Sequence, residues 1–224
     1  MSKQDRAIRT RHTILRAAAK VFEEHGYQAA TINEILTEAG VTKGALYFHF
    51  QSKEHLAQGV LTEQNNELTT PHRTTKLQEL IDTTMLHAHR LQTDPMVRAS
   101  VRLAMDQNQA TLDRSTPFLT WSKIALDLLS HAQTRGELLP HINPGETADV
   151  FVGAFAGTQA MSQALNDYSD LHQRSSTLLR HLVPSIAQPS LLTTLHMTPT
   201  RGQDVHQELH SHHTQNGTPA TATR

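Results

Sequence analysis

Two short helices with strong end signals, joined by a turn of about two residues, constrain the fold of this chain more than any other feature. Residues 31–34, Thr-Ile-Asn-Glu, form a capping box, in which the threonine oxygen accepts from one free helix amide and the glutamate accepts from another. Gly40 is expected to end this helix, and Thr42 to cap a second one that runs to about His49. Because a longer helical segment precedes the pair, the stretch predicts a helix-turn-helix.

The rest of the chain has helical periodicity and no strand pattern, so we expect an all-α fold. A first helix should run from about residue 6 to 25 and end at Gly26, and Ser52 should cap a helix that begins at Lys53. Proline-containing breaks follow near residues 94, 116 and 143. The later helices are expected at 75–91, 95–108, 117–135, 145–166 and 171–183, with a weaker one at 189–197.

We expect the chain to have three parts. Residues 1–52 form a small three-helix domain, and residues 53–197 form a larger helical domain. Residues 198–224 are rich in Thr, His, Gln and Gly and have almost no large apolar side chains. Such a composition cannot bury enough apolar surface to offset its conformational entropy, so this tail is expected to be disordered.

The charge of the chain limits how it can bind nucleic acid. A formal net charge of -1 argues against a uniformly basic surface, so any basic surface must be local. The first twenty residues carry such a cluster, opposed by Asp5 alone: Lys3, Arg6, Arg9, Arg11, Arg16 and Lys20. The chain has no cysteine, and its start lacks the apolar run of a signal peptide or membrane span. A cytoplasmic protein without a membrane partner is the simplest expectation.

The stretch VTKGALYFHF, residues 41–50, has the chemistry of a helix that enters the major groove of DNA. Thr42 and Lys43 lie at the helix start, where an anion is favoured and a lysine can reach guanine or phosphate. Gly44 would let the DNA backbone approach, and Tyr47 and His49 can extend polar tips to phosphate or a base. The other side chains are expected to hold the helix on its supports: Ala45, Leu46, Phe48 and Phe50.

Residues 7–56, notably AAAKVFEEHGYQAATINEILTEAGVTKGALYFHFQSKEHL, resemble the TetR family of one-component regulators. The resemblance implies a homodimer, with an N-terminal DNA-binding domain and a C-terminal all-helical domain for ligand binding and dimerisation. It assigns DNA contact to five residues of the second short helix: Thr42, Lys43, Gly44, Tyr47 and His49. It also assigns phosphate contact to Thr31 and Lys53, with Arg6 and Arg11 as weaker additions. Solvated surface remains the alternative for Lys53 and the basic arm.

Three residues with polar tips fall on otherwise apolar faces of the larger domain: Gln64, Trp121 and Thr158. A buried amide, indole or hydroxyl needs a partner, and for each residue alone a backbone partner in the core is the commoner outcome. Together they could orient a small, mostly apolar ligand that carries a carbonyl and a hydroxyl. Trp121 and Thr158 would donate to it, and Gln64 would donate or accept.

The segment VTKGALYFHFQSKEHLAQGVL, one downstream tryptophan and the motif GAFAGTQ together resemble the γ-butyrolactone receptors of streptomycetes, a branch that includes butenolide and furan receptors. This resemblance implies ligand contact by Gln64, Trp121 and Thr158. It also implies a repressor that leaves a pseudo-palindromic operator when the signalling molecule binds, and that controls secondary metabolism. Possible wall residues of the pocket are Leu86, Val97, Val101, Leu126 and Phe155.

Three alternatives stay open at this point. The 16 histidines invite a metal or catalytic site. However, His87 and His89 fall on different faces of a helix, and the cluster His206, His210, His212 and His213 lies in the tail. We find no pattern for catalysis, and expect no enzyme activity, metal or cofactor.

As a second alternative, the larger domain senses an antibiotic or drug, or binds no ligand. The small residues Gly153, Ala156, Gly157 and Ala160 allow close helix approach, either at a dimer interface or above a cavity.

Overall fold

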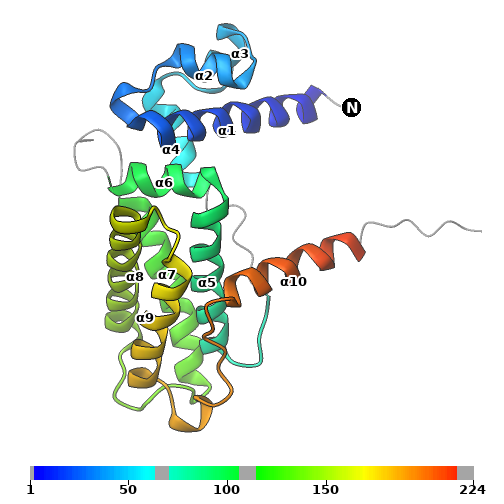
Figure 1. Ribbon diagram of the computed structural model, residues 1–224. Coiled ribbons are helices and arrows are strands. Elements are labelled where there is room, and N and C mark those ends of the chain that lie inside the picture. Colours follow the sequence, from blue (N-terminus) through cyan, green and yellow to red (C-terminus); the bar gives the residue numbers. More distant parts are fainter. Residues whose placement is uncertain (1–2, 64–70, 106–114, 216–224) are drawn as a thin grey trace, which may run out of the picture. The chain divides into compact units, whose positions relative to one another are not determined.

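The computed structural model describes residues 3–63, 71–105 and 115–215, and Figure 1 shows their arrangement as a set of helices. Within these ranges the only β-type pairing is an isolated bridge between Leu138 and Ala187, so the all-α prediction is confirmed. The chain divides into two compact units. The first combines Met1–Leu68 with Thr93–Thr120, and the second combines Thr69–Gln92 with Trp121–Arg224.

The first unit contains the predicted pair of short helices and the helices that support it. Its helices are α1 (Lys3–Ala29), α2 (Ile32–Ala39), α3 (Lys43–His49), α4 (Lys53–Glu63) and α6 (Pro95–Met105). Gly26 interrupts α1 with a positive φ of 76°, as its predicted role at the end of the helix requires, and one further turn follows it.

The ends of α2 and α3 form as their sequence predicts. Thr31 accepts from the Glu34 amide at 3.2 Å, and the Glu34 carboxylate accepts from the Thr31 amide at 2.7 Å, which completes the capping box. Gly40 ends α2 in the left-handed conformation, with φ 61°. The Thr42 hydroxyl caps α3, and Ser52 caps α4 by accepting from the His55 amide at 3.0 Å.

The first unit extends beyond the predicted boundary at residue 52, because α4 and α6 complete its core. Leu56 and Leu61 of α4 and Leu103 of α6 are essentially unexposed and pack in the same cluster as the α1 side chains. An ion pair also fastens α6 to α1, with Arg98 Nε lying 2.6 Å from Glu23 Oε1. The core of this unit includes Ile14, Leu15, Phe22, Ile35, Leu46, Phe50, Leu56, Leu61 and Leu103.

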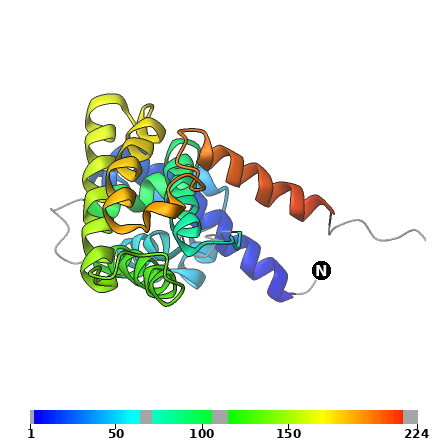
Figure 2. The ribbon, with the colours of Figure 1, turned by 90° about the horizontal axis from the view of Figure 1, so that it is seen from below.

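The second unit is a helical bundle, seen along its length from below in Figure 2. Its elements are α5 (Lys76–Thr93), α7 (Ser115–Thr134), α8 (Pro144–Asn166), α9 (Leu171–Ile186), the short 3-10 helix η1 (Pro189–Leu191) and α10 (Arg201–Gln215). The part of α7 before Trp121 belongs to the first unit. Its core includes Leu77, Ile81, Met85, Leu129, Phe151, Leu179 and Val183. No helix in the described part of the chain is long and apolar enough to cross a membrane.

The prediction of a disordered tail from residue 198 is wrong for Arg201–Gln215, which form α10. Charge and close packing, rather than a run of large apolar residues, hold this helix against α5. Arg201 donates to both carboxylate oxygens of the unexposed Asp82, at 2.7 Å each. Any side chain at Gly202 would collide with the Met85 carbonyl, and Val205 is fully buried. The predicted helix at 189–197 is reduced to η1.

Candidate functional site

Helix α3 is held by one face, and its other face is open to solvent. Leu46 and Phe50 lie four residues apart, are 0% and 1% exposed, and belong to the core of the first unit. Thr42 fixes the start of the helix, because its Oγ1 accepts from the Ala45 amide at 3.2 Å. The helix therefore presents its remaining side chains on a rigid support.

Most of the residues predicted to contact DNA lie on this open face. Lys43, Gly44 and Tyr47 are exposed, and the Lys43 ammonium lies 5.9 Å from the centre of the Tyr47 ring. A Cβ atom on Gly44 would meet no atom within 4 Å, so nothing inside the unit requires a glycine there. The open space is what a close approach of another backbone needs. His49 is half-buried and packs edge-on against Phe48, with ring centres 5.0 Å apart.

The prediction that Phe48 holds α3 on its supports is wrong, because 80% of this side chain is exposed. Phe48 lies two residues from both Leu46 and Phe50, about 200° around the helix from each, so the face that buries them must turn Phe48 outward. The two-residue spacing between Phe48 and the buried side chains was therefore the sequence signal for its exposure. An exposed apolar ring on such a helix has the chemistry to contact the methyl group of thymine.

The cations predicted to bind phosphate differ in how free they are. Arg6 is exposed. Lys53 is half-buried, donates to the Gln28 carbonyl at 3.1 Å and lies 4.6 Å from the centre of the Tyr27 ring; its burial lowers the pKa of the ammonium. Arg11 pairs with Glu63 at 3.4 Å. Lys53 and Arg11 therefore already have partners inside the first unit.

The Thr31 side chain is exposed at the start of α2, but its hydroxyl is occupied by the capping box. Its Oγ1 donates to the Glu34 carboxylate at 2.8 Å, and this bond and the Thr31 amide lower the pKa of Glu34. Thr31 is thus placed at a helix N-terminus, where an anion is favoured, but beside a carboxylate that remains charged.

A second candidate site lies inside the second unit, where three aromatic rings from α5, α7 and α8 meet. The His87 ring centre lies 4.6 Å from that of Trp121 and 5.7 Å from that of Phe155. Trp121 and Phe155 were predicted from sequence, and Leu86, also predicted, is buried on α5. Sequence reasoning missed His87, which it treated only as half of a metal-binding pair with His89. Its position within the apolar run Met-Leu-His-Ala at 85–88 was the available signal.

Other predicted ligand residues have a different placement. Thr158 is half-buried on α8, and its hydroxyl donates to the Ala154 carbonyl at 2.9 Å, so in this structure it can only accept from a ligand. Val97 and Val101 are buried on α6, which belongs to the first unit. The prediction that Leu126 lines a pocket is wrong, because it is 39% exposed while its neighbour Ala125 faces the core. Gln64 lies outside the described residues.

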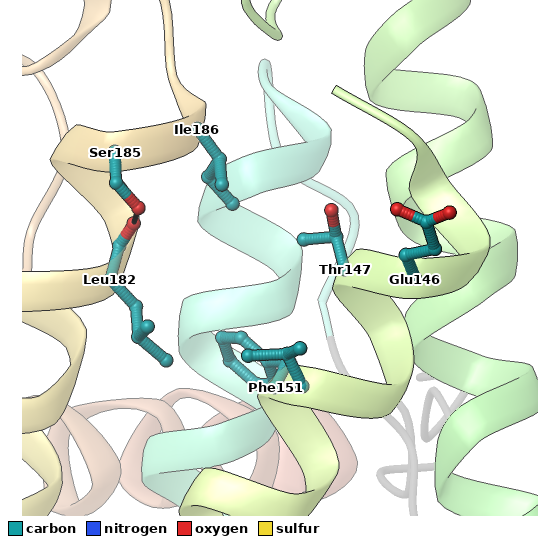
Figure 3. A pocket seen from close by; sticks show the side chains of 7 residues that line it. Glu146, Thr147, Phe151, Leu182, Ser185 and Ile186 are labelled. Carbon is teal, nitrogen blue, oxygen red and sulfur yellow. Dashed lines mark hydrogen bonds between the residues drawn. The ribbon is translucent and has the colours of Figure 1, made fainter. Parts of the chain in front are cut away.

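The surface of α8 and α9 carries a hollow and an apolar stripe. Figure 3 shows the hollow, about 220 Å³ in volume, where Phe151 of α8 and Leu182 of α9 approach each other. It is lined by Glu146, Thr147, Val150, Phe151, Leu182, Ser185 and Ile186, and therefore by none of the predicted ligand residues.

The stripe runs along α8 and includes Val150, Met161 and Leu165, each more than half exposed. Gly153 and Gly157 lie between them, and a Cβ atom added at either position would meet no atom within 4 Å. Of the two roles considered for these glycines, this open surface favours a dimer interface over a cavity roof.

Comparison with known proteins finds a family match for each of two parts of the chain. Residues 14–60 match the bacterial regulatory proteins of the tetR family, and residues 74–187 match the tetracyclin repressor-like C-terminal domain. The A-factor receptor protein of Streptomyces griseus is 39% identical over 192 residues, which cover 86% of this chain and 69% of that protein. The crystal structure of TylP, a TetR regulator from Streptomyces fradiae, is 44% identical with a TM-score of 0.84, and the match covers 91% of this chain and 98% of TylP.

A crystal structure described as a γ-butyrolactone receptor (ArpA-like protein) is 30% identical with a TM-score of 0.67, and the match covers 91% of this chain and 98% of that one. TetR regulators bind DNA operators as dimers and respond to a small ligand. The two domain matches together span most of the chain, and the relatives agree with them along its length. The chain therefore belongs to the TetR family of bacterial regulators, as a ligand-responsive repressor similar to the γ-butyrolactone receptors.

Proposed function

We propose that two copies of this chain bind a pseudo-palindromic operator, each placing α3 in the major groove. The observation that carries this proposal is the open face of α3, where Lys43, Tyr47 and Phe48 are exposed on a helix that is anchored by its opposite face. Thr42, Gly44 and His49 complete the contact. A two-fold dimer presents two such helices, and its operator must therefore carry two related half-sites.

Phosphate contacts are assigned to Thr31 at the start of α2 and to three cations, Arg6, Arg11 and Lys53. Arg6 is free to reach the backbone, whereas Lys53 and Arg11 must leave or share the Gln28 carbonyl and the Glu63 carboxylate. Thr31 would contribute through the α2 N-terminus rather than through its occupied hydroxyl. This difference predicts that Arg6 contributes most of the salt dependence among these four groups.

The proposed inducer is a small uncharged γ-butyrolactone, butenolide or furan. Support comes from the names of the relatives and from the half-buried rings of Trp121 and Phe155, which offer apolar surface and one indole donor. Gln64 and Thr158 are its proposed polar partners. The ligand must bind the operator-free conformation more tightly than the operator-bound one, since equal affinity would shift nothing. The regulated genes are those of secondary metabolism, and the protein acts in the cytoplasm without catalysing a reaction.

The test uses the single tryptophan of the chain. The protein is first used to select its own operator from random or genomic DNA fragments. Synthetic γ-butyrolactones, butenolides and furans are then titrated while Trp121 fluorescence and operator release are followed in parallel. One class should give saturable quenching and release over the same concentration range. Quenching without release would contradict derepression. No response to any class, with operator binding intact, would favour a sensor of a different molecule.

A further inference from the structure

His87 is a nearly buried polar side chain whose contacts in the second unit are with aromatic rings. It is 5% exposed, and its ring contacts Trp121 and Phe155. Its contacts with described residues are with these rings, and it makes no hydrogen bond to either of them. A buried polar group without a partner costs free energy of folding, so its presence among aromatic rings needs an explanation.

The electrostatic surroundings of His87 keep its ring uncharged. Burial, with a smaller contribution from the positive charge of Arg90 on the next turn, lowers the pKa of His87 to about 3. A neutral imidazole has one nitrogen that donates and one that accepts. The ring can therefore satisfy a neutral oxygen without bringing a charge into the apolar cluster.

A buried atom without a hydrogen-bond partner lies on the neighbouring helix. Gln159 is 6% exposed, and its Oε1 has no hydrogen-bond partner in the described part of the chain. It follows Phe155 by four residues, so the two share a face of α8. The Thr158 oxygen, which already donates, can also only accept. This face of α8 therefore offers two acceptors, the unpaired Gln159 Oε1 and the Thr158 hydroxyl oxygen.

We propose that His87 anchors a hydroxyl group of the ligand at the Trp121–Phe155 cluster. The assignment rests on the ligand site proposed above and narrows the ligand to an uncharged, lipophilic molecule with a free hydroxyl. A hydroxyl both donates and accepts, so it can accept from the imidazole N–H and donate to the unpaired Gln159 Oε1. An alkyl group in its place would leave the buried imidazole unpaired, and a carboxylate would bring a charge without a donor.

The test is a double-mutant cycle in which one side chain of the protein and one group of the ligand are changed, separately and together. Wild type and His87→Phe are titrated by calorimetry with a γ-butyrolactone that carries a free hydroxyl and with its deoxy counterpart, in which hydrogen replaces that hydroxyl. Wild type should prefer the hydroxyl compound by about tenfold or more, the usual effect of leaving one buried partner unpaired. In His87→Phe the preference should fall to within about twofold, because the group that reads the hydroxyl is gone.

His89→Phe is the matched control. It makes the same substitution two residues along α5, where the ring contacts His206 instead of Trp121. This variant should keep the wild-type preference for the hydroxyl compound. A preference that survives in His87→Phe, or that disappears equally in His89→Phe, would overturn the assignment while leaving the ligand response of the wild type intact.

A measurement without ligand checks the same assignment independently. If His87 is unpaired until ligand binds, His87→Phe should melt at the same temperature as wild type or higher, because an apolar ring of similar shape replaces an unsatisfied polar one. A marked fall in melting temperature would show that His87 has a structural partner, and would overturn the assignment. Failure of the wild type to bind either lactone would instead overturn the proposed inducer class, and this assignment with it.

Discussion

The open face of α3 and the aromatic cluster around Trp121 are both candidate binding sites, but they are encoded in different ways. The α3 surface lies within one helix, whose capping residues and buried face are all specified within about ten consecutive residues. The cluster instead assembles His87, Trp121 and Phe155 from three helices that are distant in sequence. The exposed side chains of α3 can be changed without affecting folding, whereas the position of each ring in the cluster depends on how three helices pack together.

The largest expected effect comes from removing the exposed side chains of α3. The double variant Lys43→Ala/Tyr47→Ala should lose about 100-fold or more in operator affinity, since each specific contact contributes roughly 1–3 kcal/mol and the dimer carries two copies. Its melting temperature should stay close to that of wild type, because both positions are exposed. Fluorescence anisotropy with labelled operator and a thermal melt measure the two quantities. Lys20→Ala, an exposed lysine paired with Glu38 on the same unit, is the control and should change affinity little.

Breaking the buried ion pair of the second unit should lower the stability of the protein, which the α3 variant is expected to leave unchanged. Arg201→Ala leaves the unexposed Asp82 with Arg73, 2.6 Å away, as its remaining cation. Because one partner remains, we expect a loss of about 2–3 kcal/mol in the free energy of unfolding, slightly below the usual cost of breaking a buried pair. Urea denaturation at fixed protein concentration measures it. Arg180→Ala, on the exposed side of α9, should change stability by less than about 0.5 kcal/mol. Equal midpoints for both variants would show that α10 is not docked in solution.

Acid should destabilise the aromatic cluster through His87. The pKa of this residue is about 3 in the folded protein and near 6.5 when unfolded, so below pH 6.5 the unfolded state binds the extra proton. The stability contributed by its neutral form is therefore present above pH 6.5 and lost as pH falls, by about 2 kcal/mol between pH 7 and 5. Urea denaturation at both pH values should show a smaller difference for His87→Phe than for wild type. Identical pH dependence of the two proteins would contradict the burial of an uncharged ring.

A smaller effect is expected at Phe48, whose exposure only the structure revealed. Phe48→Ala should weaken operator binding about tenfold, with the loss concentrated at thymine-containing positions of the half-site, because the ring is proposed to contact a methyl group. Stability should not change, since 80% of the side chain is already exposed. Binding to operators in which uracil replaces thymine checks the contact. If Phe48→Ala and wild type respond equally to the missing methyl, the ring does not contact it.

What sequence could predict follows the same division between local and long-range structure. The caps at Thr31, Gly40 and Thr42 were predicted correctly, because their hydrogen bonds join residues only a few positions apart. Trp121 and Phe155 were both proposed as pocket residues, and the structure brings both rings against His87. His87 was not proposed, because its environment depends on how α5 packs. Leu126 was misplaced because apolar character alone does not say which face of α7 is buried.

Helix α10 was missed for a related reason. Its docking depends on Arg201 reaching Asp82, which is 119 residues away in sequence, and on a glycine that allows close approach. Neither feature raises the apolar content of the segment, so composition indicated disorder. Long-range ion pairs of this kind leave no periodic signal in a single sequence, whereas a helix cap does.

The smallest expected effect tests whether local signals are sufficient at α2. Thr31→Ala removes the hydroxyl of the capping box and should cost about 1 kcal/mol of stability, while Thr31→Ser should retain most of it. The same pair of variants separates two roles of this residue. If Thr31 acts on DNA through the helix N-terminus, both stability and operator affinity should fall in the alanine variant and recover together in the serine variant. Loss of affinity in both variants, with stability lost only in alanine, would instead show that the threonine methyl group itself contacts DNA, which capping alone cannot explain.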